Sequence, residues 1–257
     1  MASSPSILQR RIRADGLDLH VAVAGNGPPV ILLHGFPESW RSWQHQIAPL
    51  AAAGFSVWAP NLRGYPPSDF PPHREAYHLR HLVEDVACLV EATGYGRAHI
   101  AGHDWGGIIA WTFAGMYPQR LDRLVILNAP HMKLYTDRVW RSSQLLRSLY
   151  VLFFQLPGLP ERLLASRHYK LVRDIFREMP ARKQAFTQQD IEACVNMLAQ
   201  RGALTAALDY YRINMRSDGL ALARAARTDA PTLVIWGSAI RRWSSACWMD
   251  WSSSHPT

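Results

Sequence analysis

The sequence predicts an α/β protein whose sheet is mostly parallel, and two observations support this fold class. Short runs of apolar and β-branched residues alternate with helical patterns along most of the chain. This alternation is typical of a parallel sheet with helices on both faces. The interval from residue 131 to residue 228 breaks the alternation, because it contains helical patterns and no convincing strand. We therefore expect an α/β core into which a helical cap is inserted.

The expected strands are short and are bounded by turn residues. Between the third and the fourth of them, apolar residues recur every three or four positions from Leu79 to Val90, which predicts an amphipathic helix that packs on the sheet. Thr93 and Gly94 mark the end of this helix, and another helix is expected at 108–117. The six expected strands are 17–24, 30–33, 55–58, 98–101, 124–127 and 232–236.

These elements divide the chain into three parts. Residues 1–130 form the first part of the core, residues 131–228 form the helical cap, and residues 229–257 contain the last recognisable strand and an atypical tail. A short helix at 221–227 is expected to lead from the cap back to that strand. The residues that separate helices within the cap are Pro157, Gly158, Pro160, Pro180 and Gly202.

The composition excludes several classes of protein. Of the 257 residues, 48% are hydrophobic and 19% are charged, so the disordered and fibrous classes do not apply. No apolar run approaches the roughly 18 residues that a membrane span needs. Residues 1–16 contain no apolar core of signal-peptide length, so we expect a cytoplasmic protein.

The cysteine spacing and the charge distribution argue against metal, redox and nucleic-acid functions. Cys88, Cys194 and Cys247 show no paired spacing, so we expect neither a disulfide framework nor a zinc site. The net charge of +8 comes from 28 basic residues that are dispersed along the chain. No nucleic-acid motif accompanies them. We expect no metal, no cofactor and no nucleic-acid partner, and the sequence leaves the oligomeric state open.

The most informative segment is GHDWGG at 102–107, which lies between an expected strand and an expected helix. Small residues flank Asp104 two positions before and two positions after it. This is the pattern of a nucleophile elbow, in which a strained turn lifts one side chain above the sheet. A carboxylate in this place is stabilised as the anion by free backbone N–H groups and can attack an electrophilic carbon to form an ester. The alternative is that Asp104 caps the helix beside packing glycines.

A second segment, HGFPESW at 34–40, follows the buried strand at 30–33. Gly35 permits a sharp turn there, so the loop can present a backbone N–H group to a ligand. We expect this loop and the segment around Asp104 to contribute to the same site.

The two segments together resemble the epoxide hydrolase branch of the α/β-hydrolase fold family, whose motifs are H-G-x-P-x-x-W and G-H-D-W-G-G. The segment NLRGY at 61–65 is similar to the family's R-G-Y-G-x-S-D turn, although Pro66 stands where Gly is usual. The resemblance continues through 128–131 into the cap and covers roughly residues 15–237. It implies an α/β-hydrolase fold in which Asp104 opens an epoxide, while the backbone N–H groups of Phe36 and Trp105 form the oxyanion hole.

The resemblance also implies that cap tyrosines bind the ring oxygen of the epoxide and give it a proton. A phenol suits this task because it is neutral at pH 7 and can still donate a proton. Tyr211, which is followed by Arg212, matches the family's cap tyrosine, and Tyr150 is expected to be its partner. Another alignment places Phe153 at the position of Tyr150.

The aromatic cap suggests that the substrate is a small apolar epoxide. Glu38 is expected to stay exposed, and nothing in the spacing of the motif histidines offers a second metal ligand, so they are expected to pack or to bind loop groups. The residues expected to line the substrate site are His34, Pro37, Trp40, His103 and Phe153.

The tail departs from the family pattern. The family's catalytic acid follows the strand that corresponds to 232–236, but residues 238–242 contain no carboxylate. The tail at 238–257 shows no pattern for the helix and strand that precede the family's histidine, and it resembles out-of-frame translation or truncation. Asp250 and His255 are only five residues apart, so we do not expect them to act as the acid and the base. We expect the last strand of the fold to be missing and turnover of the ester to be slow.

Two alternative functions stay open. A haloalkane-type dehalogenase would use the same aspartate chemistry, with Trp105 as one donor to the halide, but Phe36 stands where those enzymes typically carry Asn. A catalytically inactive relative that binds an apolar ligand under the cap, or a truncated gene product, would account for the tail.

Overall fold

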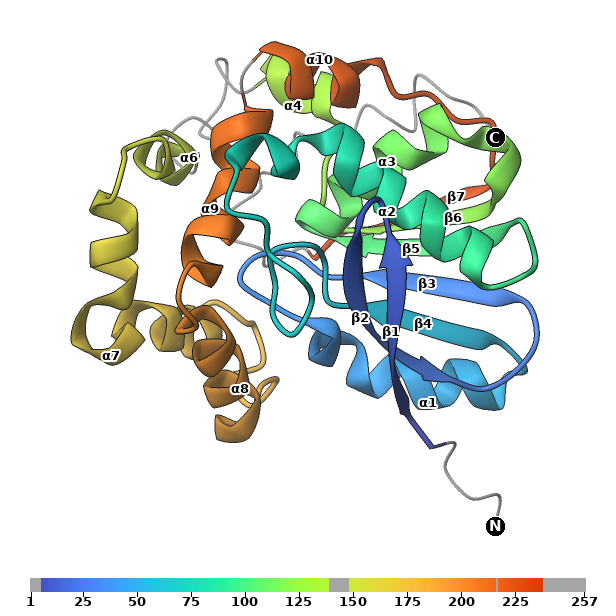
Figure 1. Ribbon diagram of the computed structural model, residues 1–257, viewed down its shortest axis with the longest axis horizontal. Helices are drawn as coiled ribbons and strands as arrows, with labels where there is room; N and C mark the ends of the chain where they lie inside the picture. The colour runs from blue at the N-terminus through green and yellow to red at the C-terminus, as the bar shows by residue number, and fades with distance from the viewer. Residues whose placement is uncertain (1–5, 139–147, 216, 238–257) are drawn as a thin grey trace.

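The computed structural model describes residues 6–138, 148–215 and 217–237. Its centre is a seven-stranded sheet with the order β1-β2-β4-β3-β5-β6-β7 (Figure 1). β2 pairs antiparallel with β1 and with β4, and all other pairs are parallel. The expected α/β class with a mostly parallel sheet is therefore confirmed.

All six expected strands are present, and none of their ends shifts by more than three residues. They are β2 (Leu17–Ala24), β3 (Pro29–Leu33), β4 (Ser56–Pro60), β5 (Ala98–His103), β6 (Leu121–Leu127) and β7 (Thr232–Ile235).

The strand β1 (Leu8–Ala14) was not expected from the sequence. It forms an edge of the sheet, and most of its residues are exposed, so it lacks the apolar alternation that marks a half-buried strand. Its seven residues pair in register with β2, and among them only Ala14 is buried. Three of its residues are arginines, so its composition does not indicate a strand. Backbone pairing with β2 defines it instead.

Helices cover both faces of the sheet. Along β3, Ile31 and Leu33 pack in the core shared with the helices α2 (Leu79–Ala92) and α3 (Trp105–Met116). Val30 and Leu32 point to the opposite face, where they pack with the helix α1 (Gln44–Ala52). This alternation buries both faces of the strand, as the sequence predicts for a parallel sheet. Short 3-10 helices lie at η1 (Trp40–Trp43), η2 (Arg74–Tyr77) and η3 (Pro118–Arg120).

The interval after β6 is helical, as expected, and α6 to α9 lie together on one side of the molecule (Figure 1). Residues 166–169 leave the helical conformation within α7, so this element consists of two segments. Pro160 lies in the first turn of α7 instead of between helices, because that turn needs no backbone N–H group. The helices of this interval are α4 (Met132–Arg138), α6 (Leu149–Phe154), α7 (Leu159–Glu178), α8 (Gln188–Leu198), α9 (Ala203–Asn214) and α10 (Ser217–Ala225).

The helix α9 fastens this helical layer to the core through buried hydrogen bonds. The Tyr210 hydroxyl donates to the Arg63 carbonyl oxygen at 2.6 Å. The Asn214 side chain accepts from Leu79 N at 2.6 Å and donates to the Tyr77 carbonyl oxygen at 2.8 Å. Because these groups are buried, each bond satisfies a polar atom that water cannot reach. The short helix expected at 221–227 is α10, which begins four residues earlier and ends two residues earlier.

Candidate active site

Asp104 occupies a strained turn between β5 and α3. Its φ and ψ angles are 52° and −120°, a conformation that a residue with a side chain rarely adopts. Asp104 occupies the N-cap position of α3, as the alternative expected, but its side chain forms no capping hydrogen bond there, so capping does not account for the carboxylate.

The flanking glycines allow this turn because neighbouring backbone lies against them. A Cβ atom on Gly102 would lie 2.2 Å from the Gly106 carbonyl oxygen. A Cβ atom on Gly106 would lie 2.2 Å from the Leu33 carbonyl oxygen. Backbone cannot yield as a flexible side chain can, so both positions require glycine. The geometry is that of the elbow expected from the sequence.

The loop after β3 lies against the Asp104 carboxylate. The Phe36 backbone N–H donates to Asp104 Oδ1 at 3.0 Å. A Cβ atom on Gly35 would lie 2.3 Å from Asp104 Cβ, so this approach also depends on a glycine. Trp105 is the first residue of α3, where backbone N–H groups have no acceptor within the helix. The two expected oxyanion-hole residues therefore flank Asp104. Phe36 comes from the loop after β3, and Trp105 is the next residue in the chain.

A cavity of about 370 Å³ opens beside Asp104. Pro37 and His103 line it on the core side, as expected for substrate-binding residues. The opposite wall is mainly apolar and comes from α7 and the segment that follows it. The residues of that wall are Ile175, Phe176, Met179, Pro180, Ala181 and Phe186.

Glu38 and His103 form an ion pair at this cavity. His103 Nδ1 lies 3.2 Å from Glu38 Oε2, and the Glu38 side chain is only 13% exposed. The expectation that Glu38 stays exposed is wrong, because its carboxylate turns inward to the imidazole. Burial alone would lower the pKa of His103, but the charge of Glu38, its hydrogen bond and the charge of Asp104 raise that pKa to about 9. In turn, His103 outweighs burial and lowers the pKa of Glu38.

His34 supports the loop from below and does not line this cavity. The imidazole is completely buried, its Nε2 accepts from Leu62 N at 3.0 Å, and its Nδ1 therefore donates to the Gly35 carbonyl oxygen at 2.9 Å. Burial lowers the pKa of His34 to about 4. The expected loop hydrogen bonding is confirmed, and a direct contact with substrate is not supported.

The two expected cap tyrosines meet on the other side of Asp104. Tyr211 on α9 and Tyr150 on α6 line a small cavity of about 20 Å³ together with Asp104 and Trp105. Their ring centroids lie 6.0 Å apart. Tyr211 also contacts the ring of Phe36, edge to face, at 5.7 Å.

Phe153 and Trp40 lie elsewhere. Phe153 is one helical turn from Tyr150 and packs on Phe154 at 6.1 Å between centroids, so it lines neither cavity beside Asp104. Trp40 lines a separate cavity, and its backbone N–H donates to Asn61 Oδ1 at 3.0 Å. The prediction that His34, Trp40 and Phe153 contact the substrate is therefore corrected, because none of them lines a cavity beside Asp104. A motif match identifies a position in the chain, but it does not say which way the side chain points.

The comparisons with known proteins agree with this geometry. Residues 28–239 match the family model described as alpha/beta hydrolase fold. The chain belongs to the α/β-hydrolase fold family. The chain is 38% identical over 234 residues to epoxide hydrolase 4 of Mus musculus, a match that covers 88% of this chain and 64% of that protein. It is 39% identical over 231 residues to the AB hydrolase superfamily protein YfhM of Bacillus subtilis, covering 88% of this chain and 79% of that protein.

Solved structures of epoxide hydrolases superpose well on this α/β-hydrolase. A mutant of an epoxide hydrolase from Bacillus megaterium aligns with a TM-score of 0.85 and 27% identity, over 95% of this chain and 88% of that chain. Epoxide hydrolase VrEH1 from Vigna radiata aligns with a TM-score of 0.81 and 28% identity, over 96% of this chain and 85% of that chain. The resemblance to the epoxide hydrolase branch is therefore confirmed. The chain spans 64% of the length of mouse epoxide hydrolase 4 and 61% of that of mouse epoxide hydrolase 3.

One further residue at the cavity of this α/β-hydrolase was not singled out as a site residue. Asn128 follows β6 with a φ of 49°, and its Oδ1 accepts from Gly237 N at 2.8 Å. Both residues line the cavity of Asp104. An asparagine directly after a buried strand is a recognisable signal, because Asn adopts the left-handed conformation more readily than most residues.

The structure leaves some of the sequence predictions untested. Asp250, His255 and the position of the family's acid lie outside the described residues. Within residues 6–138, 148–215 and 217–237, β7 is the edge strand next to β6, and no group of three or more His, Cys, Asp or Glu side chains could hold a metal ion.

The ion pair of His103 predicts a pH dependence of stability. His103 has a pKa of about 9 in the folded protein, well above its ordinary value of about 6.5. Between these two pH values the folded state holds a proton that the unfolded chain has released. The free energy of unfolding should therefore lose about 1–2 kcal/mol as the pH rises through this interval, since the partial exposure of the side chain weakens the pair.

Urea unfolding at pH 6 and at pH 9.5 measures this difference. In His103→Gln the alkaline loss of stability should disappear, because no imidazolium remains to be deprotonated. His45→Gln, a change at an exposed histidine of α1, is the matched control and should keep the wild-type pH profile. Equal pH profiles for His103→Gln and the wild type would contradict the assignment.

Proposed function

We propose that this α/β-hydrolase opens a small apolar epoxide by nucleophilic attack of Asp104. The observation that carries this proposal is the Asp104 carboxylate, which stands on a glycine-flanked elbow between a large cavity and two tyrosines. A cavity with apolar walls supports an apolar substrate, because such walls cannot satisfy the hydrogen bonds of a polar one. The similarity to epoxide hydrolases from several organisms supports the same reaction class.

In the first step, one carboxylate oxygen of Asp104 attacks a ring carbon of the epoxide. The bond between that carbon and the ring oxygen breaks, and its electron pair goes to the oxygen. A phenol of Tyr211 or Tyr150 then gives its proton to this oxygen, and the resulting phenolate regains a proton from solvent. The product is an ester between Asp104 and the opened substrate, so one covalent bond replaces another and no redox partner is needed.

Asp104 Oδ1, which accepts from the Phe36 N–H group, stays on the protein as the carbonyl oxygen of that ester when Oδ2 is the attacking atom. When water attacks the carbonyl carbon of the ester, which is Cγ of Asp104, negative charge develops on this same oxygen. The N–H groups of Phe36 and Trp105 are suited to stabilise that charge, which is the task of an oxyanion hole. Deprotonation of the water needs a base, and residues 238–242 offer no counterpart of the family's acid that would orient a histidine.

We therefore expect the ester to accumulate in this chain. Intact-mass analysis after incubation with styrene oxide should show at most one adduct per chain, and peptide mapping should place it on Asp104. Sustained diol production without any adduct would contradict this expectation and would point to an efficient base.

Two further assays separate the alternatives. Chloride release from 1-chlorobutane would favour the dehalogenase. We do not expect this release, because the Phe36 side chain beside Asp104 is an aromatic ring in contact with Tyr211, and such a ring offers no hydrogen-bond donor to a halide. Thermal stabilisation by the epoxide with neither adduct nor product would favour a protein that only binds its ligand.

A further inference from the structure

Five exposed leucines gather in one short part of the cap. Large apolar side chains are normally buried, so a group of exposed ones needs an explanation. The exposed fractions range from 44% to 61%. The five residues, which we call the leucine patch, are Leu149, Leu152, Leu156, Leu159 and Leu163.

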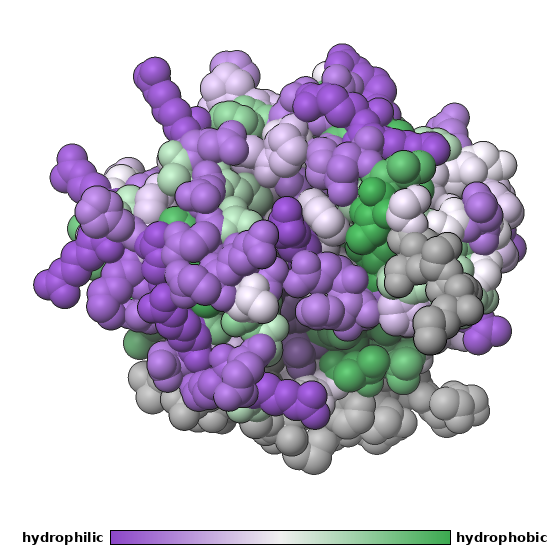
Figure 2. Space-filling model, turned by 90° about the horizontal axis from the view of Figure 1, so that it is seen from below, coloured by the Kyte–Doolittle hydropathy of each residue, from purple (hydrophilic) through white to green (hydrophobic). Residues whose placement is uncertain are grey.

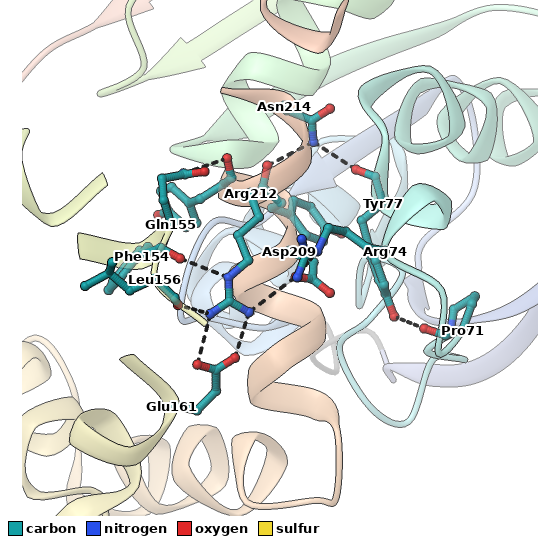
Figure 3. A network of polar contacts seen from close by, with 12 residues as sticks. Pro71, Arg74, Tyr77, Phe154, Gln155, Leu156, Glu161, Asp209, Arg212 and Asn214 are labelled. Atoms are coloured by element: carbon teal, nitrogen blue, oxygen red, sulfur yellow. Dashed lines mark hydrogen bonds and ion pairs between the residues drawn. The ribbon is translucent and has the colours of Figure 1, made fainter. Parts of the chain in front are cut away.

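The leucine patch faces away from the body of the protein because the inner sides of its helices are held to α9. Arg212 on α9 donates from Nε to the Phe154 carbonyl oxygen and from Nη2 to the Leu156 carbonyl oxygen, both at 2.9 Å (Figure 3). Its Nη1 and Nη2 also bind the Glu161 carboxylate at 2.7 and 2.9 Å. Phe154 and Leu164 are buried on this inner side. The exposed leucines belong to α6 and the first segment of α7 or to the residues between them. These two helices follow each other at the outer edge of the cap (Figure 1).

The charges beside the leucine patch are positive. Arg162 and Arg167 are exposed and, in the part of the chain that the structure describes, form no ion pair, whereas the nearby Lys170 binds the Asp174 carboxylate at 2.5 Å. Glu161 is the only acidic residue from 149 to 173, and Arg212 already binds its carboxylate. Seen from below, the surface under α7 and α8 on the left of Figure 2 is mostly hydrophilic, so exposed leucines are not a general property of the cap.

We propose that the leucine patch rests on an anionic lipid surface. Leucine side chains from α6, from the first segment of α7 and from the turn between them would enter the boundary between headgroups and acyl chains, while the neighbouring cations contact lipid phosphates. A second copy of this chain fits the leucine patch less well. It would bring its own Arg162 and Arg167 close to those of the first copy, and each chain carries a net charge of +8, so the two copies would repel each other. In the described residues no helix is long and apolar enough to span a bilayer, so the contact is with the surface.

This placement has a consequence for substrate access, which rests on the proposed function. α7 carries Leu159 and Leu163 near its beginning, and its later residues Ile175 and Phe176 line the cavity of Asp104. An apolar epoxide partitions into lipid, so a protein held at the lipid surface by this helix would meet its substrate where the substrate is concentrated. The docking itself does not depend on the chemistry at Asp104.

Flotation of the full chain with vesicles tests the docking. We expect binding to phosphatidylcholine vesicles that contain 30% phosphatidylglycerol and little binding to pure phosphatidylcholine. Leu152→Gln/Leu159→Gln should lower the partition coefficient at least tenfold, since two apolar contacts are lost. Arg162→Gln/Arg167→Gln should lower it by roughly 25-fold, at about fivefold for each charge.

Matched variants separate the leucine patch from general effects. Leu8→Gln removes a leucine that is 52% exposed on β1, and Arg10→Gln/Arg80→Gln removes two exposed charges on β1 and α2, outside the leucine patch. Both should bind vesicles nearly as well as the wild type. Adduct formation with styrene oxide in the absence of vesicles should be unchanged in all these variants, so a failure of docking is distinguishable from a failure of the chemistry.

Three outcomes would overturn the proposal. The wild type could fail to bind anionic vesicles, or the leucine-patch variants could bind as well as the wild type. The third outcome is a concentration-dependent dimer in sedimentation that Leu152→Gln/Leu159→Gln disrupts, together with no lipid binding. That result would show that a second copy of the chain covers the leucine patch.

Discussion

Asp104→Asn is expected to abolish formation of the covalent adduct. Asparagine keeps the shape of the side chain, and its carbonyl oxygen can still accept from the Phe36 N–H group, which contacts Asp104 Oδ1 at 3.0 Å. The amide is neutral, however, and lacks the anionic oxygen that attacks the epoxide. Loss of a nucleophile typically lowers a catalysed rate by about 10⁴-fold or more, so no adduct should be detected within the time in which the wild type reacts fully.

The control for this variant is Glu38→Gln. Glu38 is the other carboxylate that lines the same cavity, and it faces His103 instead of the Phe36 N–H group. If the carboxylate on the elbow is the nucleophile, Glu38→Gln still forms the adduct, and thermal melting shows that both variants are folded. An adduct that persists in Asp104→Asn and disappears in Glu38→Gln would transfer the role to Glu38.

The elbow could be predicted from the sequence because its constraints are local. Gly102 and Gly106 are required by backbone atoms that lie about 2.2 Å from the position of a Cβ atom, and only glycine meets such a requirement. A requirement of this kind appears directly in the sequence as a fixed pattern around Asp104. The strands β3, β4 and β5 were predictable for a similar reason, since burial on both faces leaves continuous apolar runs.

Features that depend on distant partners could not be predicted in the same way. The inward turn of Glu38 follows from an ion pair with His103, which is 65 residues away in the chain. The strand β1 is defined by pairing with β2 and carries exposed arginines, so its own composition gives no strand signal. Trp40 belongs to the same motif as Phe36, but the chain turns between them and directs Trp40 to another cavity. For Glu38, His103 and Trp40 the motifs therefore predicted the place in the chain, but not which groups surround each side chain in the folded protein.

The same limit applies to Arg212, which the sequence presents only as the neighbour of Tyr211. In the structure its guanidinium is buried and joins α6, α7 and α9 in one network (Figure 3). Near the same place Gln155 Nε2 donates to the Tyr211 carbonyl oxygen at 3.1 Å, so the end of α6 is attached to α9 by two side chains. These contacts determine how Tyr150 on α6 lies relative to Tyr211.

Arg212→Met should lower the free energy of unfolding by about 3–5 kcal/mol, the typical result of removing one partner from a buried ion pair. Methionine preserves much of the apolar volume but leaves the Phe154 and Leu156 carbonyl oxygens without their donor. It also leaves the Glu161 carboxylate without its bidentate partner. Urea unfolding measures the loss, and amide hydrogen exchange should increase most in α6 and the first segment of α7.

Arg74→Met is the matched control, because Arg74 binds Asp209 in the same network but its side chain is 43% exposed. It should lower the free energy of unfolding less than Arg212→Met does, because Arg74 itself is partly exposed and the buried Asp209 carboxylate keeps its contact with Arg212 Nη1 at 3.3 Å. Arg212→Lys should fall between the two, since a lysine keeps the charge and cannot reproduce the planar fork that reaches two carbonyl oxygens and a carboxylate together. If Arg212→Met proved as stable as Arg74→Met, the attachment of α6 and α7 would have to come from apolar packing. In that case the positions of Tyr150 and of the leucine patch would not depend on this arginine.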